Sequence, residues 1–270
     1  MSAPLAPARR PRPRLLGLCS LALTAALAGC GGVPGDGIHD EDTRTLSEFT
    51  AIDVSGSIAV VVRVDPALAG EEGDAAVRVS GDQNLLGHVR TDVAGGVLEI
   101  GTDAPLSPTM PLLVELGVPY IDDVAVSGSS ELKVLGFDSE SLAVRSSGSS
   151  DILLRGSADS LELASSGSSD IRIELEDSDR VLVSTSGSSD ISVCGDAREL
   201  TIESSGSSDV HAHTLVAQDV EVQSSGSSDI VVCARDSLYA AISGSGDVTY
   251  LCNPQSVRSD VSGSGDISPG

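Results

Sequence analysis

Acidic side chains recur at one position of a repeated heptad, and they are the residues of this sequence best placed to do chemistry. The heptad SSGSSDI at Ser146–Ile152 returns in closely related forms almost to the end of the chain. Calcium takes several oxygen ligands, so carboxylates at a fixed spacing could share calcium ions. They could also extend into water, or accept hydrogen bonds from the Ser-Ser amides in an Asx-like turn. The acidic position is occupied by Glu131, Asp151, Asp170, Asp190, Asp209, Asp229, Asp247 and Asp266.

The uniform distribution of these acids argues against catalysis. Paired carboxylates can cleave polysaccharides, and some enzymes of that kind are β-helical. Here, however, the acids are spread along the chain and do not gather at one singular place, and aromatic residues that could stack on a sugar make up only 2% of the chain. The sequence has neither a GxSxG nor an HExxH motif. A non-enzyme is therefore favoured, with a polysaccharide-acting β-helix enzyme as the alternative.

The glycine of the heptad recurs with a period that predicts a solenoid. Successive glycines are 18 to 20 residues apart, and a fixed period of this size is typical of stacked repeats. Coils stacked about 4.8 Å apart would bury a continuous core that no single coil can bury alone. The glycines are Gly128, Gly148, Gly167, Gly187, Gly206, Gly226, Gly244 and Gly263.

Apolar residues on both sides of each glycine alternate with a period of two, which is typical of strands. In the coil of Gly148 they are Leu142 and Val144 before the corner, and Ile152 and Leu154 after it. Each coil is therefore predicted to hold two short strands joined through GSS. A polar turn, such as RGSADS at Arg155–Ser160 or LEDSDR at Leu175–Arg180, would lead into the next coil.

The predicted fold class is all-β. Residues 127–270 form a β-solenoid with coils of 19–20 residues. Residues 46–126 lack the regular heptad and form an irregular β-rich part before it. VSGSIAVVVRV at Val54–Val64 contains a first, degenerate corner, and Ala94-Gly95-Gly96 is predicted to be a turn between two strands.

The cysteines predict one disulfide and leave a metal site open. Cys194 and Cys233 lie two coils apart, roughly 9.6 Å, which is too far for a disulfide. Cys233 and Cys252 lie one coil apart, so a disulfide between them is predicted. His213 occupies the position between Cys194 and Cys233 in the same column. Zinc binding there is an alternative, although the spacing matches no standard site.

The N-terminus predicts export and lipid anchoring. Four arginines precede the apolar run Leu15–Ala26, which is too short to span a bilayer comfortably. Leu-Ala-Gly-Cys at Leu27–Cys30 looks like a bacterial lipobox. Residues 1–29 are therefore predicted to be a lipoprotein signal peptide, with acylation of Cys30 by fatty acids such as palmitate. An ordinary signal peptide is the alternative. Gly31 in place of Asp favours the outer membrane, and residues 30–45 are predicted to be a flexible tether.

The charge of the chain excludes one class of partner. The formal net charge is −24, and removal of the first 29 residues leaves 12 basic against 40 acidic residues. Such a surface repels nucleic acid. Cations, basic proteins or solubility alone would account for the acidity.

A longer series of phrases resembles a known family. These are FTAIDVSGSIAVVV, VRVSGDQNLL, GGVLEI, LLVELGVPYIDDVAVSGSSEL and the closing SGSGDVTYLCNPQSVRSDVSGSGDI. In this order they resemble the head GIN domain family of auto-transporter adhesins over Phe49–Ile267. The resemblance implies a secreted or surface β-solenoid and no family-wide catalytic residues.

The sequence thus predicts a non-enzymatic, lipid-anchored protein of the bacterial cell envelope. Its role would be adhesion, through binding of polysaccharide, matrix or other cell-surface molecules. A repeated weak site would supply avidity without a deep pocket. A calcium-stabilised structural spacer is a further alternative to the polysaccharide-acting enzyme.

Overall fold

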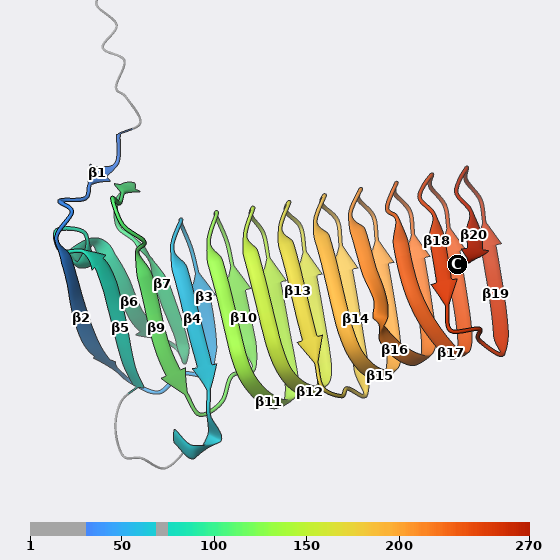
Figure 1. Ribbon diagram of the computed structural model, residues 1–270, viewed down its shortest axis with the longest axis horizontal. Coiled ribbons are helices and arrows are strands. Elements are labelled where there is room, and N and C mark those ends of the chain that lie inside the picture. The colour runs from blue at the N-terminus through green and yellow to red at the C-terminus, as the bar shows by residue number, and fades with distance from the viewer. Residues whose placement is uncertain (1–30, 69–74) are drawn as a thin grey trace, which may run out of the picture. The chain divides into compact units, whose positions relative to one another are not determined.

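The computed structural model describes residues 31–68 and 75–270. Residues 31–270 form one compact unit with a continuous hydrophobic core of their own (Figure 1). The predicted signal peptide and the predicted lipidation site at Cys30 lie outside the described residues. No helix within the described ranges is long and apolar enough to cross a bilayer.

The N-terminal part is built from short strands that pair in both directions. They are β1 (Val33–Pro34), β2 (His39–Leu46), β3 (Ala51–Val54), β4 (Ala59–Val64), β5 (Ala75–Asp82), β6 (Val89–Ala94), β7 (Val97–Thr102), β8 (Leu106–Ser107), β9 (Leu113–Val118) and β10 (Asp123–Val126), with 3-10 turns η1 (Pro66–Leu68) and η2 (Leu86–His88). The pairs β2–β5, β5–β9 and β6–β7 are antiparallel. Gly95 and Gly96 have φ of 61° and 83° in the turn between β6 and β7, as the sequence predicts.

The repeat is a stack of parallel coils. Its strands are β11 (Glu131–Ser146), β12 (Asp151–Ser165), β13 (Asp170–Leu175), β14 (Arg180–Thr185), β15 (Asp190–Ser204), β16 (Asp209–Ser224), β17 (Ile230–Ile242), β18 (Val248–Leu251), β19 (Ser256–Val261) and β20 (Ile267–Pro269). Each coil contributes one strand segment before the glycine corner and one after it. Segments on the same side of the corner pair in parallel along the stack. The predicted β-solenoid is confirmed, and its eight corner glycines delimit seven turns.

The corner glycines lie in single file. A Cβ built on Gly148 would overlap the carbonyl oxygen of Gly128, and the same relation holds at each following corner to Gly263. The file begins one corner earlier than the regular heptad, because Ser129 N–H donates to the Gly56 carbonyl at 2.7 Å. The degenerate first corner predicted within Val54–Val64 is therefore confirmed.

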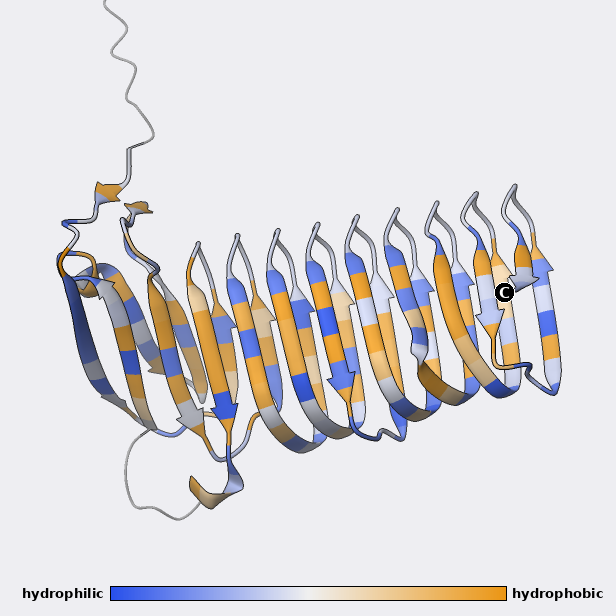
Figure 2. Ribbon diagram, in the orientation of Figure 1, coloured by the Kyte–Doolittle hydropathy of each residue, from blue (hydrophilic) through white to orange (hydrophobic). Residues whose placement is uncertain are grey.

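The predicted apolar columns fill the interior. Figure 2 shows apolar and polar residues alternating along the strands of the solenoid. Leu142, Val144, Ile152 and Leu154 are all buried, and their counterparts in the neighbouring coils are buried with them. Full burial of one such aliphatic side chain contributes about 1.5–3 kcal/mol. Rows of Val, Leu and Ile thus supply the core with almost no aromatic residues.

One predicted turn is a bend within a continuous strand. Arg155–Ser160 lies inside β12, whereas the predicted turn at Leu175–Arg180 does separate β13 from β14. Gly156 and Ala158 are buried, and a Cβ on Gly156 would overlap the Phe137 carbonyl oxygen. Small residues let this strand bend closely against the preceding coil, so pairing continues where the polar sequence suggested a turn.

The predicted tether at residues 30–45 is wrong for its second half. β2 pairs with β5 over eight residues, from His39 opposite Asp82 to Leu46 opposite Ala75. Arg44 fixes this strand, because its guanidinium donates to the carbonyls of Val89 at 2.6 Å and Leu86 at 2.8 Å. Backbone pairing and one arginine therefore outweigh a Gly- and Asp-rich composition that is typical of loops.

Candidate functional site

Each corner of the repeat presents two buried and two exposed hydroxyl side chains around its glycine. At Gly187, Thr185 and Ser189 are buried, whereas Ser186 and Ser188 are exposed. The buried pair is part of a hydroxyl ladder that runs from coil to coil. Thr185 Oγ1 lies 2.6 Å from Ser208 Oγ in the next coil. The same pairing occurs between Ser146 and Ser169, Ser165 and Ser189, and Ser204 and Ser228.

The ladder also satisfies the backbone at the corner. Ser189 Oγ accepts a hydrogen bond from Ser169 N–H at 3.2 Å and donates one to the Gly167 carbonyl at 3.3 Å. Burial of a polar group is costly unless it is hydrogen-bonded. The ladder thus explains why serine, a residue usually found at surfaces, is tolerated inside the solenoid.

The two ends of the hydroxyl ladder are visible as unpaired oxygens. Among the described residues, the buried side-chain oxygens without a hydrogen-bond partner are Ser150 Oγ and Ser224 Oγ. Each ladder bond joins the residue two before one glycine to the residue two after the next glycine. For Ser150 the partner position is Val126, and for Ser224 it is Gly246. Both orphaned oxygens therefore mark the coils at which the SSGSSD motif begins and ends.

The exposed serines before the corners line a long groove, which we call the serine groove. It has a volume of about 1010 Å³ and runs across eight successive coils. At about 4.8 Å per coil, its serine column extends roughly 34 Å. The residue before each serine pair varies, and includes Arg145, Ser184, Glu203 and Gln223. The serine column consists of Ser127, Ser147, Ser166, Ser186, Ser205, Ser225, Ser243 and Ser262.

The serine groove carries isolated charges and no aromatic residue among its lining side chains. Arg145 forms an ion pair with Asp123 at 2.5 Å. The hydrogen bond from this carboxylate is the main cause that raises the pKa of Arg145 above its ordinary value. The remaining charged lining residues, Asp53, Glu203 and Asp260, are acidic. The groove can therefore donate and accept hydrogen bonds, and it disfavours polyanions.

The predicted acid column lies on the other side of the corners, along a shallower groove of about 510 Å³, which we call the acid groove. Glu131, Asp151, Asp170 and Asp190 occur there in register from coil to coil. The register continues to Asp209. The stacked arrangement expected from the glycine period is thus present in the fold.

Nearby bases and backbone amides offset the repulsion in this column. Lys133 Nζ lies 2.6 Å from Glu131 Oε1, and His211 Nε2 lies 3.6 Å from Asp190 Oδ1. In the last coils, the Asp266 N–H donates to Asp247 Oδ1 at 2.8 Å. Within the described part of the chain, no three His, Cys, Asp or Glu side chains are grouped as a metal site would require. Calcium bridging of the column stays a prediction.

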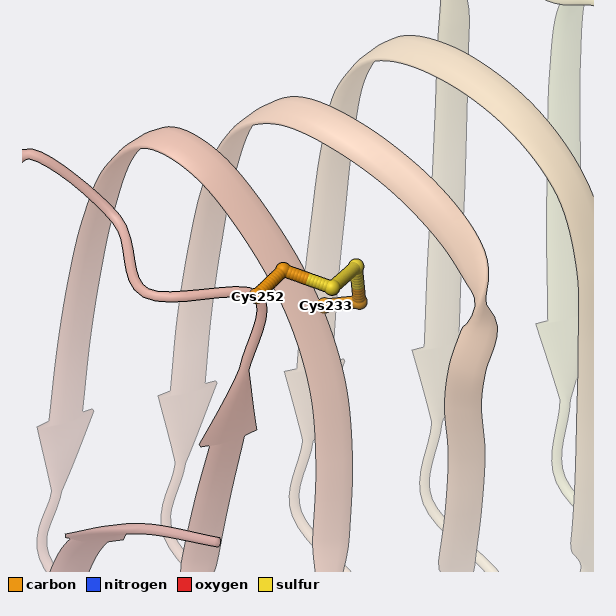
Figure 3. The surroundings of a disulfide bond; sticks show 2 residues. All are labelled: Cys233 and Cys252. Carbon is orange, nitrogen blue, oxygen red and sulfur yellow. A yellow bond between two sulfur atoms is a disulfide. The ribbon is translucent and has the colours of Figure 1, made fainter.

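Cys233 and Cys252 form a disulfide bond with a Cα–Cα distance of 5.2 Å (Figure 3). It joins β17 to the loop after β18, where Cys252 has a positive φ of 72°. Cys194 has a free thiol.

The proposed column of Cys194, His213 and Cys233 is wrong. A register shift after Ser192 places Cys194 opposite Thr214, and Cys233 lies opposite Val216. The irregular pairing of β15 with β16 thus removes His213 from the column that the constant period suggested.

The two grooves were not predicted from the sequence. They arise from the outward-facing residues on either side of the corner, whose chemistry varies from coil to coil. The one available signal was the invariant small residue directly before each glycine. It keeps one outward column free of bulk along the whole stack.

Solved structures with the same fold come from gut bacteria. A "putative adhesin" from Parabacteroides merdae has a TM-score of 0.79 at 22% identity, covering 88% of this chain and 98% of that one. A "putative lipid binding protein" from Parabacteroides distasonis has a TM-score of 0.78 at 22% identity, covering 88% and 99%. A second "putative adhesin" from that species has a TM-score of 0.77 at 24% identity, with the same coverage.

No curated protein matches the sequence. The model of one protein family does match, over residues 48–254, which is most of the chain. The solenoid, its corner motif and this match agree, and the chain belongs to the family described as "Putative auto-transporter adhesin, head GIN domain".

Proposed function

We propose that this protein is a non-enzymatic adhesion module of the bacterial envelope, anchored by lipid at Cys30, and that its serine groove binds an extended polysaccharide chain. Family membership supports an adhesin-like role at the cell surface. The single observation that carries the choice of ligand is the continuity of the serine groove over eight coils. A site that repeats along a line suits a ligand that repeats along a line.

The chemistry of the groove favours a neutral polysaccharide. Its hydroxyl column can exchange hydrogen bonds with sugar hydroxyls, each of which contributes about 0.5–1.5 kcal/mol net. The formal net charge of −24 disfavours acidic polymers. Without aromatic stacking, affinity for a single sugar is weak. Several coils that engage one chain together provide avidity.

A glycan-array experiment tests this proposal with the soluble unit, residues 31–270, which has its own core. We expect binding to neutral polysaccharides that increases with chain length. The double variant S186Y/S205Y places two large side chains in the serine groove, and we expect it to weaken binding at least about 10-fold. The matched control is S188Y/S207Y, because these serines are equally exposed at the same corners but lie outside the groove.

The outcomes separate the alternatives. Equal loss in both double variants, or in neither, would refute the serine groove as the binding surface. Release of new reducing ends from a bound polysaccharide would establish the enzyme in place of the adhesin. Binding to basic proteins alone would transfer the function to the acid groove.

The anchor is tested in the full chain. We expect C30S to abolish incorporation of labelled palmitate and to release the protein from the membrane fraction of a bacterial host. Unchanged membrane association of C30S would contradict lipid anchoring. The soluble glycan experiment does not depend on this result.

A further inference from the structure

The last coil of the solenoid has an open edge. Within the described residues, β19 pairs only with β17, and β20 pairs only with β18 (Figure 1). Val257 and Val261 of β19 are 43% and 44% exposed, although Leu238 and Ile242, their register partners in β17, are buried. The apolar columns therefore end in side chains that face the interior direction of the coil but have no coil to cover them.

The backbone of β19 has unused hydrogen-bonding groups along this edge. Ser262 N–H donates to the Ile242 carbonyl at 2.8 Å. In a parallel ladder, alternate residues bond to the same neighbour, so Asp260 and Arg258 also direct their backbone groups to β17. The N–H and C=O groups of Val257, Ser259 and Val261 then point away from the solenoid. An edge of this kind is a template for another strand.

We propose that this edge docks the same edge of a second copy of the chain, with the two β19 strands antiparallel about a twofold axis at Ser259. In this register Ser259 lies opposite its own copy. Val257 of one chain lies opposite Val261 of the other, so the exposed apolar residues cover one another. Arg258 lies opposite Asp260 of the other chain on the outer face.

The sequence of β19 is therefore complementary to itself in both its apolar and its charged residues. Arg258 and Asp260 are both exposed, and neither has an ion-pair partner within the described ranges. Twofold pairing would give each of them one, and a symmetric dimer would contain two such pairs. Opposite charges at facing positions also fix the register of an antiparallel pair.

The second strand of the open edge limits where hydrogen bonds can form. Val248 N–H donates to the Asp266 carbonyl at 2.8 Å, so Ile267 and Pro269 direct their backbone to the open side. Proline has no N–H to donate and is typical of edge strands. The hydrogen bonds between copies therefore form along β19, whereas Ile267 contributes apolar contact.

Head-to-tail stacking of copies is disfavoured by the other end of the unit. That end is closed by β2 and β6, which are antiparallel to their neighbours. β2 carries Asp40, Glu41 and Asp42 in succession, and its polar face offers no continuation of the aliphatic columns. A closed dimer through two identical ends satisfies both open edges at once.

Sedimentation velocity of the soluble unit over a range of concentrations up to about 1 mM tests the proposal. We expect a concentration-dependent dimer. R258D and D260R each place like charges opposite each other twice, and we expect each to weaken dimerisation by about 100-fold. The double variant R258D/D260R restores opposite charges and should dimerise again. An equimolar mixture of the two single variants should form heterodimers.

A matched control and an edge variant complete the test. R235D makes the same charge change at an exposed arginine of the preceding coil and should dimerise like the wild type. S259P removes the central N–H that faces the open edge, and should be monomeric with an unchanged circular dichroism spectrum. A wild-type monomer at every concentration would overturn the proposal. So would a dimer that all three charge variants leave intact.

Discussion

The regular coils and the N-terminal part satisfy their buried polar groups in different ways. In the coils, a hydroxyl pair such as Ser165 with Ser189 is repeated from turn to turn. In the N-terminal part, the fully buried Asp82 accepts hydrogen bonds from Gly37 N–H at 2.8 Å, Thr109 N–H at 2.8 Å and the Thr109 hydroxyl at 2.5 Å. The repeat thus distributes one solution over many sites, whereas the N-terminal part depends on a single carboxylate.

The largest expected effect breaks the repeat at its closest contact. In G187A the new methyl group would overlap the Gly167 carbonyl oxygen, and no flexible side chain is present there to move aside. We expect a loss of more than about 4 kcal/mol of unfolding free energy, or failure to fold. G87A is the control, since a Cβ at Gly87 meets nothing within 4 Å. Urea denaturation followed by circular dichroism measures both. Equal stability of the two variants would refute the glycine file as a steric requirement.

The next effect concerns the N-terminal carboxylate. The hydrogen bond from the Thr109 side chain is the main cause that lowers the pKa of Asp82 below its ordinary value of 3.8. A lowered pKa in the folded state adds stability that is present above the unfolded pKa and is lost as the pH falls through the folded pKa. We expect D82N to lower the Tm at neutral pH, and we expect its difference from the wild type to shrink as the pH falls below about 4.

The exposed Asp92 provides the comparison for this measurement, because it lies in the same part of the molecule without such bonds. D92N should leave the Tm close to that of the wild type from neutral to acidic pH. A gap between D82N and the wild type that stays constant on acidification would show that the charge of Asp82 is not what stabilises the fold.

A smaller effect tests the hydroxyl ladder. S189A removes the partner of Ser165 Oγ and the acceptor of Ser169 N–H. Loss of a partner for buried polar groups costs about 1–3 kcal/mol. S188A at the exposed neighbour should be almost neutral. The sharper comparison is S224A, which we expect to be less harmful than S189A because its oxygen has no partner to lose. Equal losses for S189A and S224A would contradict the ladder.

The smallest effect is expected in the acid column. Asp190 is exposed, so D190N should change the unfolding free energy by no more than about 0.5 kcal/mol. Tm values in calcium and in chelator, for the wild type and D190N, separate a solvated column from a calcium-bridged one. A large fall of the wild-type Tm in chelator, absent in D190N, would establish the calcium-stabilised alternative.

The regular half of the fold follows from the sequence because its signals are redundant. A period marked by glycine, with alternation such as Leu142 and Val144 in every coil, specifies strands, register and core together. The N-terminal strand β2 was missed because its order comes from β5 and Arg44, which are distant in the chain. The grooves were missed because outward side chains define them only after the coils are stacked.

The disulfide pair could be inferred because a constant period converts sequence separation into distance. The same rule failed for His213, since the pairing of β15 with β16 shifts register between Ser192 and Cys194. Period-based inference is therefore sound where each coil repeats the last. It fails where one coil carries an extra residue.

The orphaned hydroxyls at Ser150 and Ser224 bear on how this molecule could evolve. The residues that terminate the ladder, Val126 and Gly246, lie in the flanking coils and not in the repeating ones. Tandem duplication of a gene segment that encodes one coil would add one internal rung and leave both terminators unchanged. The length of the protein can therefore change in increments of about 4.8 Å, with no accompanying mutation elsewhere.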